Sequence, residues 1–289
     1  MSHPSFQHLP VLVLESRRAT EMATLVTTYG GRPHSAPALR EVPIESNAEA
    51  LACVDRLVLG EFDVAVFLTG VGLRALLAVV DARRSRDAFV AALARVRIVA
   101  RGPKPVAVLR ELRLTPWVTA PEPNTWREVL AAIDGQGSSV LRGLRVAVQE
   151  YGTSPAPLIE GLRARGASVL QVPVYRYALP HDLAPLEAAV GAVIGGEIGV
   201  ALFTTATQVT HLFQVAARMG REDDLRAHLR TVAIGSIGPT TSDELREHGV
   251  AVDFEASHPK MGFLVREAAE QGPALSRSKR GPDRSRALP

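Results

Sequence analysis

The chain has 289 residues, 46% of them hydrophobic, and a formal net charge of +3. This length suggests about two domains, and the apolar content is ample for two cores. Pro, Arg or Asp interrupts every apolar run before it reaches the ~18 residues of a membrane-spanning helix, so we expect no membrane partner.

Short apolar runs alternate with amphipathic helical patterns through the first half of the chain. We predict strands at residues 11–16, 64–69 and 96–100, and helices at 19–29, 71–82 and 103–112. The first helix should stop at Gly30-Gly31, and Pro103 should open the third.

The second half repeats this alternation. We predict strands at residues 145–149, 169–174, 200–204 and 232–235, and helices at 156–165, 207–219 and 240–248. Strands that are apolar on both faces and separated by helices indicate parallel sheets covered on each side. The expected fold class is α/β, with two similar Rossmann-like or flavodoxin-like lobes.

The sequence contains an internal repeat, in which the two copies are offset by 136 residues. The segment FDVAVFLTGVGLRALLAV at residues 62–79 aligns with IGVALFTTATQVTHLFQV at residues 198–215. The same offset relates four further pairs: Gly30 and Gly166, Pro37 and Pro173, Ile98 and Ile234, and Pro103 and Pro239. Two matching lobes with a cleft between them are expected, and small ligands bind in such clefts.

The predicted strand-to-helix turns are rich in small and hydroxylated residues. They are Thr69-Gly70-Val71-Gly72, Thr204-Thr205-Ala206-Thr207 and Ser236-Ile237-Gly238-Pro239-Thr240-Thr241. Ligands of parallel α/β sheets bind at this edge, where helix amide groups can hold anions. Ser and Thr at helix starts are also ordinary N-caps, so any one turn favours a cap, whereas several converging turns favour a polyanion site.

Familiar catalytic signatures are absent from the sequence. There is no Walker loop, GxGxxG or GxSxG motif, and the eight histidines form no metal-ligand pair. We therefore expect no metal and no cofactor, and an enzyme built on this chain would work by orientation, hydrogen bonding and general acid assistance.

Several of these segments resemble the uroporphyrinogen-III synthase family. The most specific match is VAIGSIGPTTSDELREHGV at residues 232–250, with its strand, IGPTT turn and helix. Supporting matches, in the same order and spacing as in the family, are SRR followed by a helix at 16–31, AVQEYG at 147–152, VPVYRY at 172–177 and FTT at 203–205. The resemblance covers about residues 10–271.

The resemblance implies a particular division of the chain. One lobe should comprise residues 1–38 and 176–271, and the other residues 39–175, joined by two antiparallel connector strands that begin after Pro37 and Pro173.

The missing secretory signal in MSHPSFQHLP and the single cysteine, Cys53, favour the cytoplasm. The family also implies a monomer.

The implied activity is a cofactor-independent cyclising lyase that acts on an acidic linear tetrapyrrole. Hydroxymethylbilane would lose water, its last pyrrole ring would be inverted through a spiro intermediate, and uroporphyrinogen III would form. Tyr175, at the family's tyrosine position on a connector, is the first candidate for proton donor, and Thr241 is the second catalytic candidate. The alternative for Tyr175 is a side chain that only packs the hinge.

The strand-to-helix turns, the repeat and the resemblance together give the candidate substrate-binding residues. They are Arg17, Arg18, Thr69, Gly70, Arg101, Tyr151, Gly152, Thr204, Thr205, Ser236, Gly238 and Thr240. The three arginines can equally be solvated side chains. The sequence departs from the family pattern at two places: residues 205–207 lack the Ser and Asn often seen there, and residues 100–105 differ from the IGPTT turn.

The last residues carry the excess positive charge. Residues 272–289 hold five basic residues against one acidic residue, a net of +4; subtracting this from +3 leaves −1 for the rest. We expect a disordered basic tail and no nucleic-acid partner, unless the chain is fused to a DNA-binding domain. Such a fusion would make it a ligand-sensing module of a transcriptional regulator, the alternative to a synthase. A periplasmic-type binding protein is disfavoured by the missing signal.

Overall fold

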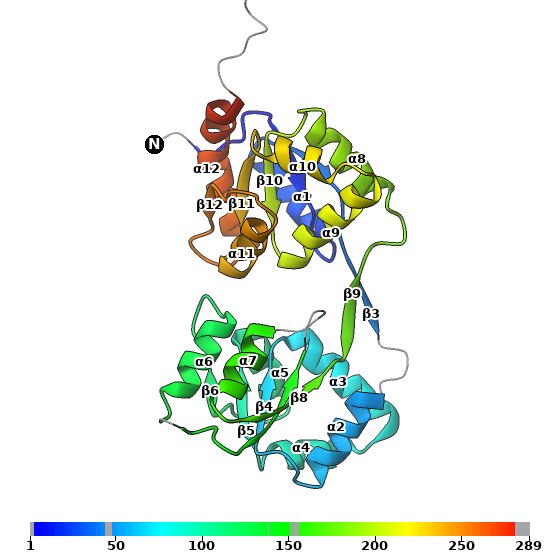
Figure 1. Cartoon of the computed structure of the whole chain (residues 1–289), viewed down its shortest axis with the longest axis vertical. Helices are drawn as coiled ribbons and strands as arrows, with labels where there is room; N and C mark the ends of the chain where they lie inside the picture. The colour runs from blue at the N-terminus through cyan, green and yellow to red at the C-terminus, as the bar shows by residue number, and fades with distance from the viewer. Residues whose placement is uncertain (1–2, 44–47, 138, 151, 153–155, 281–289) are drawn as a thin grey trace, which may run out of the picture. The chain divides into compact units, whose positions relative to one another are not determined.

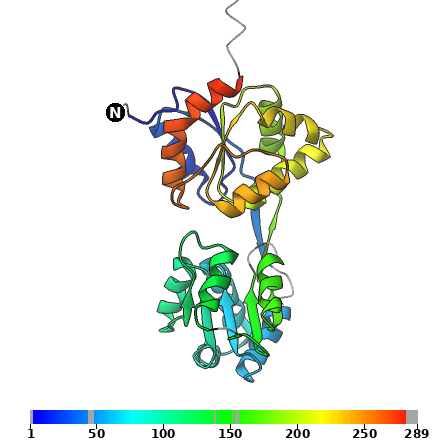
Figure 2. The ribbon, with the colours of Figure 1, turned by 60° about the vertical axis from the view of Figure 1, so that its left-hand side comes forward.

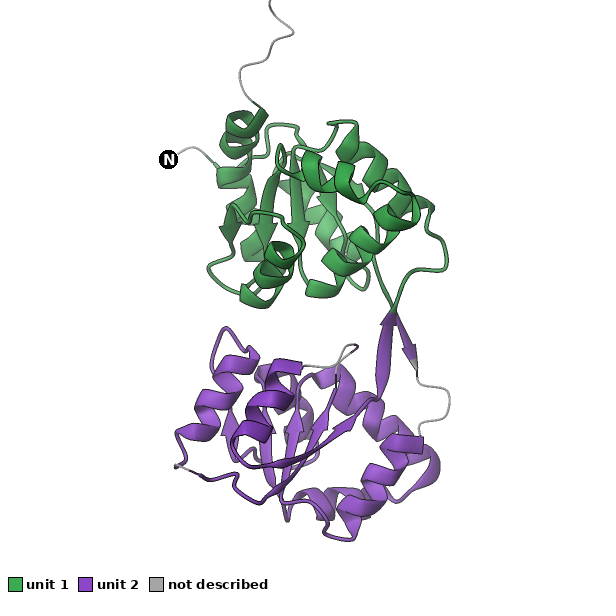
Figure 3. Cartoon of the chain, viewed as in Figure 1, with its two compact units in different colours: residues 1–40, 178–289 green, residues 41–177 purple. Residues whose placement is uncertain are grey.

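The computed structural model describes residues 3–43, 48–137, 139–150, 152 and 156–280. The chain divides into two compact units, one of residues 1–40 with 178–289 and one of residues 41–177 (Figure 3). We call these unit 1 and unit 2. The chain crosses between the units after residues 40 and 177, two residues beyond each crossing expected from the sequence.

Unit 1 is a parallel five-stranded sheet in the order β12-β11-β10-β1-β2. Its strands are β1 (Pro10–Val13), β2 (Arg32–Ser35), β10 (Val200–Phe203), β11 (Ala233–Ser236) and β12 (Phe254–Glu255). Its helices are α1 (Ala19–Thr28), α8 (Ala184–Ile194), α9 (Ala206–Arg218), α10 (Glu222–Leu229), α11 (Pro239–Glu247) and α12 (Met261–Arg280), and they cover both faces of the sheet (Figures 1 and 2).

Unit 2 has the corresponding parallel sheet in the order β6-β5-β4-β7-β8. Its strands are β4 (Val64–Phe67), β5 (Arg97–Ala100), β6 (Val118–Thr119), β7 (Arg145–Gln149) and β8 (Ser168–Val172). Its helices are α2 (Ala48–Val58), α3 (Gly70–Arg83), α4 (Arg86–Leu93), α5 (Pro103–Glu111), α6 (Trp126–Asp134) and α7 (Ala156–Ala164). The doubly wound α/β class predicted from the sequence is confirmed.

The two crossings of the chain form a small sheet of their own. Strands β3 (Arg40–Pro43) and β9 (Tyr175–Ala178) pair in a two-stranded antiparallel sheet, as expected for the connectors. The Arg40 guanidinium Nε donates to the Leu179 carbonyl oxygen at 3.0 Å.

The central strands are apolar throughout because helices cover both faces of each sheet. In β4, Ala65 and Phe67 belong to one hydrophobic cluster of unit 2, whereas Val64 and Val66 belong to another. Successive strand side chains point to opposite faces, so both faces must be apolar. Strand β10 divides between the two clusters of unit 1 in the same way.

The repeat is visible in the element boundaries. Strands β4 and β10, β5 and β11, and β6 and β12 begin and end 136 residues apart, as do helices α2 and α8, α4 and α10, and α5 and α11. Strands β1 and β7 depart from this offset: Val11 pairs with Val200 as Val146 pairs with Val64, an offset of 135. A constant offset of 136 along the chain was therefore wrong for this strand, because one residue is gained or lost in the connection to α1 or α7.

The prediction of a disordered tail from residue 272 was wrong as far as residue 280. Helix α12 continues to Arg280, with Gly272 and Ser276 buried against unit 1. All three basic side chains of residues 272–280 have partners in unit 1: Lys279 Nζ donates to the Val232 carbonyl at 2.9 Å, Arg277 Nη1 to Gln7 Oε1 at 2.8 Å, and Arg280 Nη2 to the Ile198 carbonyl. Composition predicted disorder because it does not reveal these partners, and residues 281–289 lie outside the described residues. In the described part of the chain, no helix is both long and apolar enough to span a membrane.

Candidate active site

In unit 1 the strand-to-helix turns gather at one edge of the sheet. Strands β1, β10 and β11 are parallel neighbours, so the turns that follow them leave from the same edge. The FTT turn follows β10, and the IGPTT turn follows β11. The hypothesis of a polyanion site requires these two turns to lie together, and within unit 1 both lie at the same edge of the sheet.

The turn after β10 is built on a threonine cap. Thr205 is the N-cap of α9, and its hydroxyl oxygen accepts the Gln208 amide hydrogen at 3.3 Å. Thr204 donates its amide to Gln208 Oε1 at 2.8 Å and its hydroxyl to Glu15 Oε2 at 2.6 Å. The capping interpretation therefore holds for Thr205, and a capping hydroxyl that accepts one hydrogen bond can still donate its own hydrogen.

The turn after β11 leaves one helix amide for a ligand. Ser236 is fully buried, and its hydroxyl donates to the Gly238 carbonyl at 2.9 Å. The amides of Thr241 and Ser242 donate to the same carbonyl at 3.1 and 3.0 Å. Pro239 has no amide hydrogen, and within the described part of the chain nothing accepts that of Thr240. This amide lies at the positive end of α11, where anions are stabilised.

The two threonines of this turn face different surroundings. Thr240 is exposed, whereas Thr241 is only 3% exposed. Thr240 therefore presents both a hydroxyl and an amide hydrogen to solvent. Thr241 is buried beside the turn, where its amide hydrogen bond to Gly238 helps to shape the backbone.

The turn after β1 brings two arginines to the same edge. Arg17 and Arg18 are both exposed. Arg18 forms an ion pair with Glu21, with Nε at 2.6 Å from Oε2, so part of its charge is already compensated. The Arg18 amide donates to Glu15 Oε1 at 3.4 Å, and Glu15 Oε2 accepts from the Thr204 hydroxyl.

Unit 2 has an equivalent edge with different chemistry. Thr69 caps α3 and accepts the Gly72 amide hydrogen at 2.9 Å. Gly70 must lack a side chain, because a Cβ there would lie 2.7 Å from the Lys104 carbonyl oxygen. Arg101 follows β5 and donates its amide to the Phe67 carbonyl at 3.0 Å, which places a cation where unit 1 has Ile237.

Tyr175 is placed on β9 and packs into unit 2. It is 5% exposed, belongs to the hydrophobic cluster that includes Val172 and Val174, and meets the Tyr177 ring edge-on with 5.5 Å between centroids. Gly152 has φ of +67°, and any Cβ there would overlap the Tyr177 ring. Tyr151 lies outside the described residues.

Sequence reasoning missed the two glutamines that order these turns. Gln208 holds the Thr204 amide, and Gln149, 2% exposed, lies with its Oε1 3.5 Å from the Thr69 amide nitrogen. Thr205 followed three residues later by Gln208 fits the capping-box pattern, so that signal was present in the sequence. Gln149 is the last residue of β7, directly after the apolar run at 146–148, and the sequence offered no comparable signal for it.

The chain matches the family model of uroporphyrinogen-III synthase HemD over residues 20–266. It belongs to the uroporphyrinogen-III synthase family. A crystal structure of a mutant uroporphyrinogen III synthase from Thermus thermophilus is 28% identical, covers 91% of this chain and 99% of its own, and superposes with a TM-score of 0.71. A putative uroporphyrinogen-III synthase of Methanothermobacter thermautotrophicus is 29% identical over 81% of this chain and 87% of its own length. The uncharacterized protein YjjA of Bacillus subtilis is 27% identical over 88% of this chain and 93% of its own length.

Membership of the uroporphyrinogen-III synthase family places the chain among cyclising lyases of tetrapyrrole biosynthesis. The comparisons favour this interpretation over the ligand-sensing module of a regulator. Among the residues that the structure describes, no three His, Cys, Asp or Glu side chains group as metal ligands would.

Proposed function

We propose that this chain cyclises hydroxymethylbilane to uroporphyrinogen III, inverting the last pyrrole ring. The observation that carries the proposal is the family match over residues 20–266, which runs through both repeats. The exposed donors of Thr240 at the start of α11 agree with it, because the substrate is a polycarboxylate that needs oxyanion binding sites.

The reaction requires a proton donor and a suitable bound conformation of the substrate, and no cofactor. A general acid protonates the terminal hydroxyl, which leaves as water, and the pyrrole nitrogen stabilises the resulting azafulvene cation. The substituted carbon of the last ring then attacks to give a spiro intermediate. Its fragmentation and reclosure at the other carbon reverse that ring, and loss of a proton restores the aromatic pyrrole. The protein's contribution is to hold the flexible chain so that the substituted carbon is near.

Carboxylate binding is assigned to the turns of both units. In unit 1, the hydroxyl and amide of Thr240 and the hydroxyl hydrogen of Thr205 are offered to the substrate. The donors of Thr204, Ser236 and Gly238 are bound within the protein and shape these turns, beside which Thr241 is buried. In unit 2, Thr69 and Gly70 are assigned the same role, and Gly152 is assigned to the wall of the substrate site. Arg17, Arg18 and Arg101 contribute positive charge, and that of Arg18 is partly compensated by its ion pair with Glu21. Neutral donors at helix starts bind carboxylates without a strongly basic surface.

Tyr175 is assigned as the proton donor to the departing hydroxyl. Its position on β9, one of the two connecting strands, and its match to the family tyrosine support the assignment. The packing of its ring against Tyr177 and the core of unit 2 would hold the phenol in one orientation.

The decisive experiment measures the isomer of the product. Purified protein is mixed with freshly prepared hydroxymethylbilane, and the uroporphyrinogen isomers are separated after oxidation. We expect the type III isomer in excess, above a control without protein in which closure without inversion gives type I. A product that is entirely type I, at a rate equal to the control, would reject the proposed activity.

A further inference from the structure

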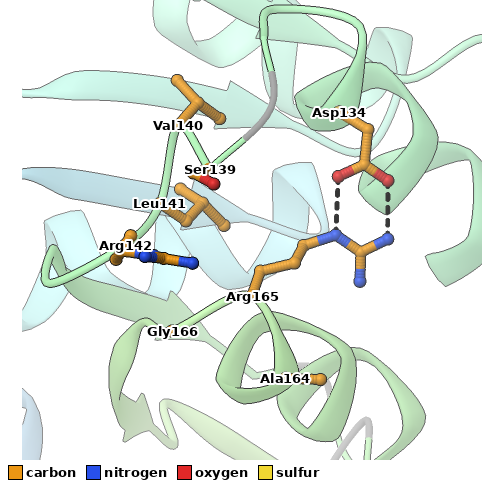
Figure 4. Close-up of a pocket in the computed structure, with 8 residues that line it drawn as sticks. All are labelled: Asp134, Ser139, Val140, Leu141, Arg142, Ala164, Arg165 and Gly166. Atoms are coloured by element: carbon orange, nitrogen blue, oxygen red, sulfur yellow. Dashed lines mark hydrogen bonds and ion pairs between the residues drawn. The ribbon is translucent and has the colours of Figure 1, made fainter.

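Unit 2 contains a polar hollow at the end of its sheet opposite to the turns described above. The hollow has a volume of about 300 Å³ and is lined by Asp134, Ser139, Val140, Leu141, Arg142, Ala164, Arg165 and Gly166 (Figure 4). Ser139–Arg142 precede β7, and Gly166 precedes β8, so the hollow lies at the edge where these strands begin. The catalytic turns follow the strands and therefore lie at the opposite edge of the sheet.

One wall of the hollow is a fixed ion pair. Arg165 donates from Nε to Asp134 Oδ1 at 2.7 Å and from Nη2 to Oδ2 at 2.6 Å, and its Nη1 donates to the Gly161 carbonyl at 2.8 Å. This pairing lowers the pKa of Asp134, which stays ionised. The two charges compensate each other, and the bidentate geometry fixes both side chains.

The other wall offers donors that the protein does not use. Arg142 is exposed, and among the described residues its guanidinium has neither an ion pair nor a hydrogen bond. Figure 4 shows the Arg142 side chain and the Ser139 hydroxyl on the side of the hollow across from the Arg165–Asp134 pair. The hollow thus has one uncompensated positive charge, carried by a planar group with five donors.

Unit 1 fills the equivalent place with its own chain. Gln7 occupies the position of Arg142, at the offset of 135 that relates β1 to β7. Its Oε1 accepts from Arg277 Nη1 at 2.8 Å, and Arg277 belongs to the part of α12 beyond Glu270. Glu270 corresponds to Asp134, the residue at which α6 ends. Within the described residues, unit 2 has no helical cover equivalent to the end of α12, and it places an arginine where unit 1 has a glutamine bound to an arginine.

We propose that this hollow is a second ligand site, which binds a small molecule through an oxyanion. The Arg142 guanidinium and the Ser139 hydroxyl hold the carboxylate or phosphate group of the ligand. The Asp134 oxygens each keep a lone pair for a ligand hydroxyl. The volume is at the lower end of the range for small-molecule sites, so the ligand is a small metabolite and not the tetrapyrrole.

The test is a titration of the full chain with inorganic phosphate and, separately, with acetate, at constant ionic strength set by chloride. Backbone amide NMR shifts of residues 139–143 and 165–166 report on the site. We expect saturable shifts in these segments with at least one of the two anions, and which anion saturates first identifies the group. Arg142→Gln, which introduces the residue found at the equivalent place in unit 1, should weaken binding at least about tenfold.

The matched control is Arg163→Gln. Arg163 is exposed on α7, close in sequence, outside the lining of the hollow, and its loss changes the net charge equally. We expect the affinity of this variant to stay within about twofold of the parent, because a remote exposed charge is screened. Equal weakening in both variants, or no saturable shift with either anion, would overturn the proposal. Both outcomes are independent of synthase activity, because the readout is binding at this hollow.

Discussion

The turns after β11 and after β5 share their backbone hydrogen bonds but present different side chains. Ile237 and Arg101 donate their amides to Phe203 and Phe67 at 2.9 and 3.0 Å, and each turn continues with Gly-Pro into a helix. Unit 1 then has Thr240 and Thr241, whereas unit 2 has Lys104 and Pro105. A duplicated fold thus keeps the hydrogen bonds that shape a turn, while the side chains that a ligand would meet differ freely.

The units also differ in the glutamine that orders the helix start after β10 in unit 1 and after β4 in unit 2. In unit 1, Gln208 on α9 binds the Thr204 amide, and the counterpart of Gln149 at the offset of 135 is Leu14, which is fully buried. In unit 2, that helix position is Gly72, and Gln149 reaches in from β7. A Cβ at Gly72 would overlap the Gln149 amide, so the two arrangements are mutually exclusive at one place.

The largest effect on activity is expected at Tyr175, which has no tyrosine counterpart in the other repeat. Tyr175 corresponds to Leu39 at the offset of 136, so its phenol has no counterpart in the other repeat. Tyr175→Phe should lower kcat about a hundredfold with little change in KM, because loss of a general acid slows the step and not the binding. Steady-state kinetics with isomer analysis measure this. Tyr177→Phe is the control, and equal activity of parent and Tyr175→Phe would leave Tyr175 a packing role only.

The glutamine exchange can be tested as a double-mutant cycle. Gly72→Gln alone should destabilise the protein by about 1–3 kcal/mol, because the new side chain overlaps Gln149 in a packed interior. Adding Gln149→Leu recreates the arrangement of unit 1 and should recover most of that loss. Urea unfolding of the parent, both single variants and the double variant gives the coupling. Additive effects would show that the two positions do not compete for one place.

The difference between the two Gly-Pro turns can be sharpened by substitution in each. Thr241→Ala should raise KM about tenfold and lower the share of type III product, because the IGPTT turn loses its support and a hydroxyl. Lys104→Thr introduces the unit 1 residue at the position of Thr240 and should change KM less. An unchanged isomer yield in Thr241→Ala would remove that turn from the site.

The smallest effect is a pH dependence present in one repeat only. His211 in α9 lies with Nδ1 2.7 Å from the Ala38 carbonyl oxygen, and unit 2 has Ala75 at that position. Burial lowers the pKa of His211, and nearby Arg218 lowers it further. The unfolded chain, with a pKa near ~6.5, then takes up the proton more readily than the fold, so stability falls as pH decreases below about 6.5.

His211→Gln should reduce this dependence. The free energy of unfolding, measured in urea at pH 7 and at pH 5, should fall by less in the variant than in the parent. The slope attributable to one histidine is at most about 1.4 kcal/mol per pH unit. A slope that is the same in both proteins would mean that His211 does not contribute to it.

The sequence by itself determined the fold class, the repeat and most element positions. The predicted helix at 103–112 and strand at 96–100 lie within one residue of α5 and β5 at each end. This succeeded because residues that are buried on both faces of a strand must all be apolar, and proline at a helix start leaves a recognisable mark. The edge at which FTT and IGPTT lie also followed, because parallel strands send their turns to one edge.

Only the tertiary structure decided which polar groups of those turns are already bound to the protein. Thr205 and Thr240 look alike in the sequence, yet one hydroxyl caps a helix and the other is exposed. The docking of residues 272–280, the exchange between Gln208 and Gln149, and the open hollow beside Arg142 all depend on residues distant in sequence. Local propensity and periodicity carry no information about such partners, because a hydrogen bond between segments is formed only when the chain has folded.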